Sequence, residues 1–477
     1  MRRIFERYPD KSRRVLEILI PLTSWAIITM PFWLSFWHPA LVSYFVIAFI
    51  IYWFYKSATL AVHAIRAYFT IKAQMQVDWM GKVKQLPDWK KVHHVVIIPE
   101  YKEPYHVLRE TILNLTKQDY PNQAITLVLA TEARDQTARE VVEKLKKEFA
   151  SSFGNFFVTR HTLKYEEVAG KSSNMAYAGR VIEERLRAKK IDLAYTTVTS
   201  CDADAILHPK YFSYLTFTFL SEPDREYHFY QAAILFYSNI WNVPLPGRVL
   251  NTIGSIYNLS LLRQEARLIN FSTYSLCFKT VAEVGFWGKD VIPEDYHLFF
   301  KVYFAKGERV RVNAIFLPIS VQAALSTGFW RTMINQYEQY KRWAWGISDV
   351  PFVVKNYFIH SEIPFIDRTM RLLTLLENHV SWPIHWFILT LGSTIPPLIN
   401  PTFARTALGY NLPRISSTIL TAAWVFLLVI IILDLKVKPK RPATYPRWKL
   451  PILYLQWLSL PVVSFFLSAL PGLDAHT

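Results

Sequence analysis

Two groups of long apolar segments, one near each end of the chain, restrict its fold more than any other sequence feature. Near the amino terminus, Ile18–Trp37 and Leu41–Tyr55 are rich in aliphatic and aromatic residues, and a His38-Pro39 pair separates them. As a helix rising about 1.5 Å per residue, the first segment can cross a bilayer core about 30 Å thick. The second segment is shorter and is expected to continue through Ser57–Val62. Both segments therefore predict membrane-spanning helices.

Three further apolar segments near the carboxyl terminus raise the expected number of spans to five. The first of them contains Glu377, His379 and His385, so a buried amphipathic helix is the alternative for that segment. The basic stretch before the first span is not followed by a small-residue cleavage site, and we therefore expect no cleaved signal peptide. The three segments are Leu372–Ile399, Ile415–Leu433 and Leu450–Leu470.

Basic residues in the short flanking loops predict the orientation of these spans. Dense groups of arginine and lysine lie before the first span and after the fourth, whereas the loop between the third and fourth spans has only Arg405 and Arg414. If both dense groups face the cytoplasm, five spans alternate without conflict and residues 64–371 lie inside the cell. We therefore expect an integral protein of the plasma membrane with a cytoplasmic domain. The dense groups are Arg2, Arg3, Arg7, Lys11, Arg13 and Arg14 at the head, and Lys436, Lys438, Lys440, Arg441, Arg447 and Lys449 in the loop.

Composition removes several other classes of protein. The 477 residues are 52% apolar and include only 14 glycines, which excludes disordered, collagen-like and disulfide-scaffold chains. The formal net charge of +17 fits the basic groups that flank the membrane segments. Such groups favour contact with anionic lipid headgroups. We find no nucleic-acid-binding module. Cys201 and Cys277 lie far apart, so no structural disulfide is expected.

Between the membrane segments, short β-branched runs alternate with segments of helical spacing. This alternation predicts an α/β domain with a mostly parallel, doubly wound sheet, in which ligands bind beyond the carboxyl ends of the strands. The expected strands are His94–Pro99, Ala124–Thr131, Phe156–Thr159 and Leu193–Ser200, and the expected helices are Pro104–Leu115, Thr137–Phe149 and Ser172–Lys189. The expected division of the chain is 1–63 (membrane helices), 64–328 (cytoplasmic domain), 329–371 (amphipathic interfacial segment) and 372–477 (membrane helices).

Two carboxylates follow the fourth expected strand at once. In Asp202-Ala203-Asp204, the acids can converge on one hard divalent cation as the strand opens into the turn before Pro209. Mg²⁺ and Mn²⁺ prefer oxygen ligands and often keep phosphate oxygens in their shell. The alternative is that both acids are merely solvated or capping residues.

Three other short motifs have residues suited to phosphate, proton and sugar chemistry. Lys171 follows Gly170 at a predicted helix start, where backbone amides and a lysine favour a phosphate. Asp295, in Pro-Glu-Asp, could act as a general base towards a hydroxyl. In the segment QYKRW, Arg342 could hold a diphosphate and Trp343 could stack on a sugar ring. The alternatives are ordinary helix caps for the first two motifs and an interfacial aromatic and cationic belt for the third.

Together, these motifs resemble the processive family 2 glycosyltransferases, which include cellulose, chitin and hyaluronan synthases. The resemblance runs from about Val95 to Gly346 and includes the arrangement of spans on either side. Its strongest part is the match of Gln339, Arg342 and Trp343 to the family's Gln-x-x-Arg-Trp signature. The matching segments are VVIIPEYKEP, KSSNMA, SCDAD, PED and QYKRW.

The resemblance implies a GT-A fold and an inverting, metal-dependent hexosyltransferase that extends a glycan from a nucleotide-sugar donor, expected to be a UDP-sugar. It implies that Asp295 is the catalytic base and that Mg²⁺ or Mn²⁺ is bound by Asp202 and Asp204. Donor contacts are expected from Glu132, Lys171, Asp202 and Arg342, and acceptor contacts from Gln339, Arg342 and Trp343. A glycan or a lipid-linked acceptor and membrane lipids are the other expected partners.

Three positions depart from the family pattern. The usual Asp-Asp-Gly-Ser type segment is replaced by ATEARD, in which Glu132 is the chosen substitute, and Lys102 and Ala176 occupy positions that are usually asparagine. These changes suggest a divergent subfamily. Two alternatives to polymer extension therefore stay open, namely transfer of a single sugar to a lipid carrier such as a polyprenyl phosphate, and a catalytically silent membrane scaffold.

Overall fold

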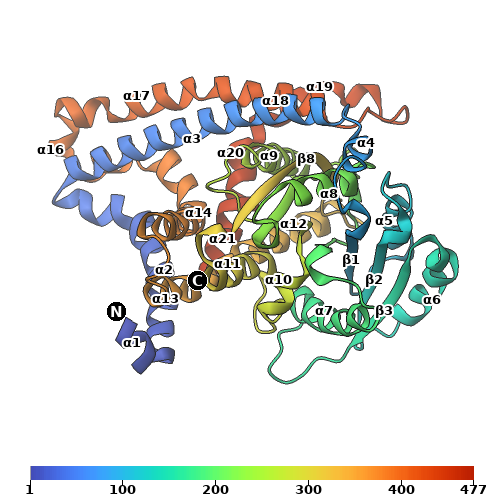
Figure 1. The fold of residues 1–477 in the computed structure, drawn as a ribbon. Helices are drawn as coiled ribbons and strands as arrows, with labels where there is room; N and C mark the ends of the chain where they lie inside the picture. Colours follow the sequence, from blue (N-terminus) through green and yellow to red (C-terminus); the bar gives the residue numbers. More distant parts are fainter. Residues whose placement is uncertain (1) are drawn as a thin grey trace.

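The computed structural model describes residues 2–477, which leaves Met1 outside the described residues. An α/β domain occupies one side of the molecule, and long helices from both ends of the chain extend away from it (Figure 1). The central element of the domain is an eight-stranded sheet in the order β3-β2-β1-β4-β7-β6-β8-β5. The strands are β1 (His93–Glu100), β2 (Ile125–Glu132), β3 (Asn155–His161), β4 (Thr196–Ser200), β5 (Ile206–Leu207), β6 (His228–Leu235), β7 (Tyr274–Cys277) and β8 (Arg311–Ser320).

The first half of the sheet is parallel and the second half is mixed. β1 pairs in parallel with β2 and β4, and β2 pairs in parallel with β3. β7 lies antiparallel between β4 and β6, β8 is parallel to β6, and β5 is antiparallel to β8. The predicted parallel, doubly wound arrangement therefore describes β1–β4. The later strands give the sheet its mixed character.

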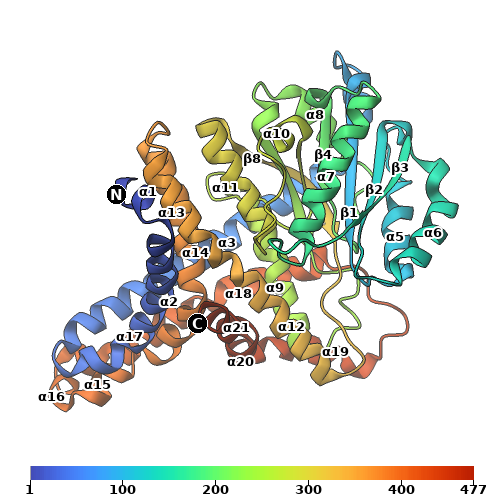
Figure 2. The ribbon, with the colours of Figure 1, turned by 90° about the horizontal axis from the view of Figure 1, so that it is seen from below.

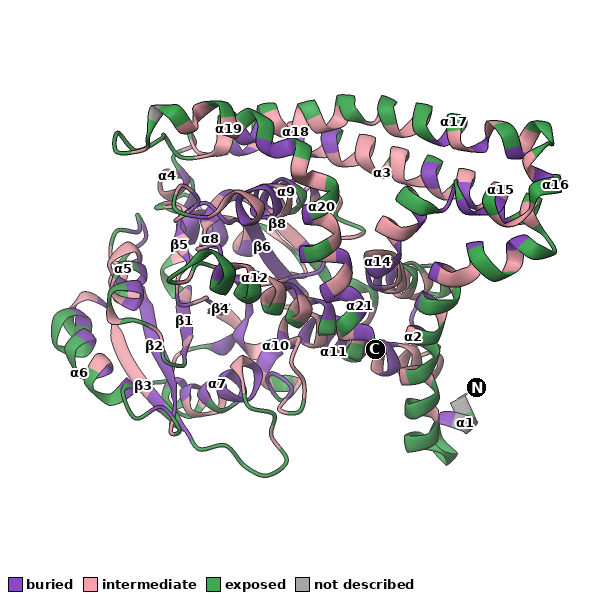
Figure 3. Cartoon of the chain, turned by 180° about the vertical axis from the view of Figure 1, so that it is seen from behind, coloured by how far each residue is buried: buried purple, intermediate pink, exposed green. Residues whose placement is uncertain are grey.

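Helices cover both faces of the sheet, which explains why the strand residues are apolar on both sides (Figure 3). On β1, Val96 and Ile98 face the cluster that includes the residues of α5 and α6, while Val95 and Ile97 face the cluster that includes α7, α9 and α11. This alternation is the period of two expected for a strand. The helices of the domain are α4 (Trp79–Val83), α5 (Tyr105–Leu115), α6 (Ala138–Phe149), α7 (Lys171–Ala188), α8 (Tyr211–Ser221), α9 (Leu245–Leu261), α10 (Phe278–Glu283) and α11 (Glu294–Lys306).

The seven predicted strands and helices of this region all form, with one change at a strand start. Leu193–Tyr195 is a 3₁₀ turn, and β4 begins only at Thr196. The Asp192 side chain accepts a hydrogen bond from the Ala194 amide at 2.9 Å, and this local bond holds the turn in place of the first strand residues.

The strand order places a switch point between β1 and β4. The chain proceeds from β1 outward to β2 and β3, and then returns to pair β4 with the other side of β1. In open α/β sheets, ligands bind at the carboxyl ends of the strands beside such a point. Asp202 follows β4 at this end, and the ladder continues as far as Cys201, whose amide donates to Ile97.

Among residues 2–477, four helical segments are long and apolar enough to span a membrane, and the fifth expected segment is not among them. They are Pro9–Phe36, comprising α2 (Pro9–Trp33) and a 3₁₀ turn; Pro39–Gln74, which is α3; Ala407–Val437, comprising α17 (Ala407–Ala422) and α18 (Trp424–Val437); and Leu450–His476, comprising α19 (Leu450–Leu455), α20 (Leu460–Ser464), α21 (Leu470–His476) and the turns between them.

The segment expected as the third span is α14 (Phe365–Leu391), which does not meet the apolar criterion. Its Glu377, His379 and His385 lower its hydropathy, as the alternative of a buried amphipathic helix anticipated. Its buried residues, which include Arg371, Leu375 and His379, recur at helical spacing along one stripe. The helix packs against α2 and leads the chain from α13 (Val350–Ile359) towards α15 (Ile395–Ile399) and α16 (Pro401–Ala404) (Figure 2).

The helix α3 lies beside α17 and α18 (Figures 1 and 2). Large apolar residues such as Trp424, Leu428 and Ile432 are exposed on α18, as expected for a surface that meets lipid. Two of the expected domain boundaries fall inside helices. The boundary after residue 63 lies within α3, which extends to Gln74, and the boundary after residue 371 lies within α14, which begins at Phe365. The remaining helices are α1 (Arg2–Arg7) and α12 (Phe329–Ala344).

Candidate active site

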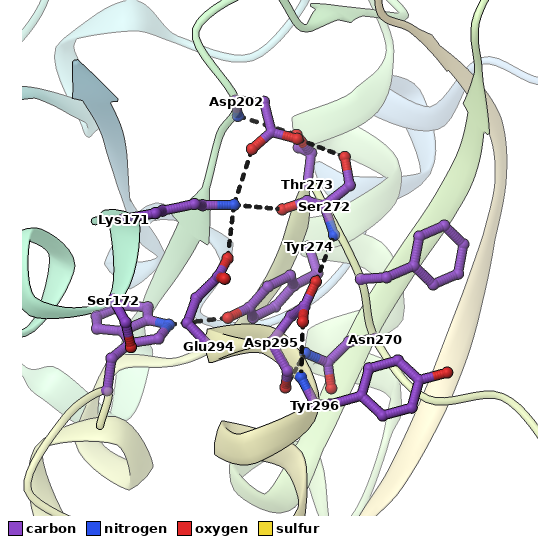
Figure 4. Close-up of polar contacts among 12 residues, drawn as sticks. Lys171, Ser172, Asp202, Asn270, Ser272, Thr273, Tyr274, Glu294, Asp295 and Tyr296 are labelled. Carbon is purple, nitrogen blue, oxygen red and sulfur yellow. Dashed lines mark hydrogen bonds and ion pairs between the residues drawn. The ribbon is translucent and has the colours of Figure 1, made fainter. Parts of the chain in front are cut away.

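Lys171 joins three segments that are far apart in the sequence. Its Nζ lies 2.8 Å from Asp202 Oδ1 and 2.8 Å from Glu294 Oε1, and it donates to the Ser272 carbonyl at 3.1 Å (Figure 4). Lys171 is the first residue of α7, Asp202 follows β4, and Glu294 is the first residue of α11. The network therefore lies at the carboxyl end of β4, where sequence analysis expected the site.

Ser272 bridges the two predicted catalytic motifs. Its hydroxyl donates to Asp202 Oδ2, and its amide donates to Asp295 Oδ2 at 3.0 Å. The backbone φ of Ser272 is 58°, in the left-handed region that residues with a Cβ seldom adopt. This conformation directs the amide, carbonyl and hydroxyl of one residue towards three different partners.

Asp295 is oriented by backbone groups and not by a cation. Its Oδ1 accepts the Tyr296 amide at 2.8 Å and its Oδ2 accepts the Ser272 amide, while its own carbonyl accepts from Asn270 at 3.0 Å. Each carboxylate oxygen has two lone pairs, so each keeps capacity for a further donor such as a hydroxyl. The side chain is only partly buried, which leaves it accessible.

The charges of the site shift the pKa values of its members in different directions. Burial opposes ionisation of Lys171, but the charges of Asp202 and Glu294 outweigh this and hold its pKa well above the usual value. Burial would raise the pKa of Asp202, but Lys171 outweighs it and the pKa is lowered. Burial raises the pKa of Glu294 to about 7 and also raises the pKa of Asp295. The network thus combines a fixed cation, an ionised Asp202 and two carboxyls that favour protonation.

Asp204 contributes further negative charge beside Asp202. Its Oδ2 accepts the Gln322 amide at 2.7 Å. Burial raises the pKa of Asp204 to about 6, and the charges of Asp202 and Glu103 add to the shift. This concentration of carboxylate charge fits a hard divalent cation, as does the oxygen-only donor set. Among residues 2–477 there is no group of three or more histidine, cysteine, aspartate or glutamate side chains arranged for a metal, so further ligands would come from a bound molecule or water.

The QYKRW segment lies on α12. The charge of Arg342 adds to that of Lys171 in lowering the pKa of Asp202. Trp343 packs against Phe236 and Tyr340, with ring centroids 5.5 and 4.8 Å apart. Gln339 accepts a hydrogen bond from Gln336 at 3.2 Å. Arg342 therefore interacts with Asp202 through its charge, while Trp343 and Gln339 contact Phe236, Tyr340 and Gln336.

Glu132 belongs to a separate cluster at the end of β2. It is buried and lies 2.5 Å from Arg134 Nε, and the Arg134 guanidinium covers the Tyr101 ring at 4.1 Å. The acid that ties this region to β1 is Asp135, which accepts the Lys102 amide at 2.7 Å. Lys102 has a φ of 59°, a left-handed conformation in which asparagine is enriched, so the departure at this position concerns side-chain chemistry and not backbone shape.

Sequence reasoning missed two members of the network. Glu294 was within the Pro-Glu-Asp motif, so its carboxylate could have been proposed as the partner of a nearby lysine. Ser272 had no such signal, because its role depends on a left-handed backbone in a loop without a recognisable motif.

Comparison with known proteins adds a family to this geometry. The family model described as "Glycosyl transferase family group 2" matches residues 197–434, from within β4 to within α18. Comparison with curated proteins finds no match. The fold is GT-A-like, and apolar helices near both ends of the described residues could span a membrane. The match supports assignment to glycosyltransferase family 2.

Several solved structures are similar to this chain. The mannosyltransferase PcManGT from Pyrobaculum calidifontis, in complex with GDP-Man and Mn²⁺, is 15% identical with a TM-score of 0.42, covering 80% of this chain and 100% of its own. A TarS fragment of S. aureus with UDP-GlcNAc is 10% identical, with a TM-score of 0.34 and coverage of 73% and 93%. GalNAc-T7 with UDP, GalNAc and Mn²⁺ is 12% identical, with a TM-score of 0.36 and coverage of 60% and 58%.

Proposed function

We propose that this protein is a membrane-embedded, inverting hexosyltransferase that extends a polysaccharide from a UDP-sugar at the cytoplasmic face of the plasma membrane. The observation that carries the proposal is the network of Lys171, Asp202 and Asp295. These residues come from three distant segments and meet at the carboxyl end of β4. The Gln-x-x-Arg-Trp segment on α12, which resembles the signature of polymer-forming family members, supports polymer extension over single transfer.

In this proposal the residues divide between a leaving-group side and an acceptor side. Lys171 and Arg342 stabilise the negative charge of the departing nucleoside diphosphate. Asp202 and Asp204 would hold Mg²⁺ or Mn²⁺, which supplies further charge neutralisation to the diphosphate when bound. Glu132 is proposed to contact the nucleotide, and Gln339 and Trp343 to contact the acceptor glycan.

Asp295 receives the proton of the acceptor hydroxyl. As the acceptor oxygen bonds to the anomeric carbon, the bond from that carbon to the diphosphate oxygen breaks on the opposite face, which inverts the configuration. The two backbone amides that bind Asp295 fix the direction of its carboxylate, so that the remaining lone pairs point at the acceptor.

Substitution of Asp295 tests this assignment. We expect Asp295→Asn to abolish sugar transfer by purified protein, because the amide cannot accept the hydroxyl proton, and to leave UDP-sugar binding within about threefold of the unchanged protein. Asp290→Asn, at an exposed acid five residues earlier, is the matched control and should transfer at the normal rate. Product is measured with labelled UDP-sugars and Mn²⁺, and its length is resolved by gel. Turnover by Asp295→Asn would remove this residue as the base.

The product also decides between the proposed reaction and its alternatives. Chains many sugars long support polymer extension, whereas a lipid-extractable product with one sugar establishes single transfer to a lipid carrier. Absence of both transfer and UDP-sugar binding under all metal conditions would favour a silent scaffold.

A further inference from the structure

An ionic cluster lies where the membrane helices meet the catalytic domain. Lys56 Nζ is 2.6 Å from Glu377 Oε1, and Arg267 Nη2 is 2.6 Å from Glu377 Oε2. The Tyr52 hydroxyl also donates to Glu377 Oε1. Tyr52 and Lys56 belong to α3, Glu377 belongs to α14, and Arg267 lies in the loop between α9 and β7. The cluster is separate from the Lys171 network.

The cluster has more positive than negative charge. Two cations share a single carboxylate, which leaves a net charge of +1, and Glu377 is the acid whose charge acts on Lys56. The three side chains are 25–30% exposed, so they are neither fully solvated nor sealed from a ligand. Lys56 and Arg267 are each paired with Glu377, but the single carboxylate balances only one of the two positive charges. Unbalanced charge beside apolar helices is costly, so an anion would complete the charge balance of the cluster.

The loop containing Arg267 leads directly to the proposed base. It continues through Asn270 and Ser272, which both bind Asp295. Tyr296, next to Asp295, interacts with Asn378 on α14 and with the charge of Arg267. The proposed base and the cluster are therefore connected by the loop that contains Arg267 and by the contacts of Tyr296.

A buried histidine on the same helix as Glu377 lies beside Tyr296. His379, also on α14, is only 5% exposed, and its ring centroid is 6.2 Å from that of Tyr296. Within residues 2–477, neither ring nitrogen of His379 has a hydrogen-bond partner. A buried imidazole without partners is expected to bond to a ligand or water.

The position of Lys56 along α3 places the cluster at a membrane surface. Lys56 is seventeen residues after Pro39, the first residue of the 36-residue helix, which corresponds to about 26 Å along the axis. That length is close to the thickness of a bilayer core, about 30 Å. An anion held there would belong naturally to a molecule anchored in the bilayer.

We infer that Lys56 and Arg267 form a binding subsite for the phosphate of a membrane-anchored acceptor, whose hydroxyl end lies at Asp295. Tyr52 and Glu377 hold the two cations in place, and the tetrahedral phosphate offers oxygens to both. This inference rests on the proposed function and specifies the acceptor as an anionic lipid-linked molecule.

Binding of decyl phosphate to the full chain in phosphatidylcholine nanodiscs tests the subsite without requiring transfer. We expect Lys56→Gln and Arg267→Gln each to weaken binding about tenfold, because each removes one cation. Lys56→Arg keeps the charge and should bind normally. The matched control is Lys72→Gln, an exposed lysine on the same helix, which should leave binding unchanged.

Competitors identify the source of the phosphate. Decanol should not displace labelled decyl phosphate, and inorganic phosphate should do so only at far higher concentration. Equal competition by inorganic phosphate, decanol or glucuronate would overturn the lipid-phosphate assignment, as would normal binding by both Lys56→Gln and Arg267→Gln.

The readout also separates this inference from the proposed function. Decyl phosphate binding that depends on Lys56, without any sugar transfer, would support the subsite and refute the proposed function. Transfer that depends on Asp295, with no phosphate binding, would refute the subsite alone.

Discussion

At the scale of single residues, chemistry was easier to predict from the sequence than geometry. The acids at 202, 204 and 295 and the lysine at 171 were identifiable because carboxylates and a lysine at element ends suit metal, proton and phosphate chemistry. The structure brings Asp202, Lys171 and Asp295 together. Ser272 was not predictable, because its importance arises from a positive φ that no neighbouring residue type signals.

The left-handed backbone of Ser272 gives a prediction in which two substitutions are compared. Ser272→Ala and Ser272→Gly both remove the hydroxyl that binds Asp202, so each should lower kcat/KM for sugar transfer about tenfold. The two should differ in stability, because a Cβ at this φ costs about 1 kcal/mol that glycine avoids. We expect Ser272→Gly to unfold about 2 °C above Ser272→Ala in thermal scans.

The same pair of substitutions at Ser151 provides the control. Ser151 is exposed and lies in a short 3₁₀ turn with ordinary backbone geometry, so alanine should be the more stable replacement there. Equal stability of the two Ser272 variants would contradict the conformational argument, and normal kcat/KM would contradict a role for the hydroxyl.

At the scale of elements, hydrophobic periodicity predicted the strands and helices of the first half of the domain but not the strands of the second half. Strands β1–β4 and helices α5–α7 have clear spacing of two or of about 3.6, and all seven form close to their expected bounds. The positions of β5–β8 depend on pairing between distant segments, such as antiparallel β7 between β4 and β6. Local patterns do not specify such pairing.

A buried ion pair connects the element α18 to the domain. Asp434 accepts from Tyr237 at 2.9 Å and from Thr252 at 3.2 Å, and its other oxygen is 2.5 Å from Lys438 Nζ. The side chains of the pair are 5% and 3% exposed. Because Tyr237 closely follows β6 and Thr252 belongs to α9, the cluster joins an apolar helix to the domain that contains the active site.

Removal of one member of this pair should be more harmful than removal of both. Asp434→Asn leaves Lys438 buried without its counter-charge and should lower the free energy of unfolding by about 3 kcal/mol, while Asp434→Asn with Lys438→Met should recover most of the loss. Glu143→Gln, which breaks the exposed pair with Arg139, is the control and should change stability by less than about 1 kcal/mol. Unfolding is followed in detergent by circular dichroism. A double variant as unstable as the single one would refute the account.

At the scale of the whole molecule, composition predicted a membrane protein with five spans. Among residues 2–477, four of the five expected segments contain a helix that is long and apolar enough to cross a bilayer, and the polar residues of α14 keep the fifth below that level. In the structure α14 still leads the chain from α13 towards α16, so we propose that it crosses the bilayer with its polar residues directed at neighbouring helices. The expected boundaries at residues 63 and 371 fall inside α3 and α14, so each of these helices is shared by two of the expected regions.

The proposed orientation predicts which segments react with an impermeant maleimide. Asp10→Cys and Thr444→Cys should be labelled in inside-out vesicles, and Thr402→Cys in right-side-out vesicles, because basic residues favour the cytoplasmic side. All three positions are exposed. The natural cysteines, Cys201 and Cys277, are buried and provide an unreactive background. Labelling of Thr402→Cys and Thr444→Cys from the same side would refute the arrangement.

The length of α3 has a mechanical consequence. Its 36 residues extend about 54 Å, nearly twice the depth of the hydrocarbon layer, and its later turns pack against α9 and β8. One end of α3 is therefore expected to contact lipid, while its other end packs against the sheet of the catalytic domain. A thicker or thinner bilayer that tilts this helix would also move the catalytic domain relative to the water interface, so lipid chain length becomes a physical variable of the reaction.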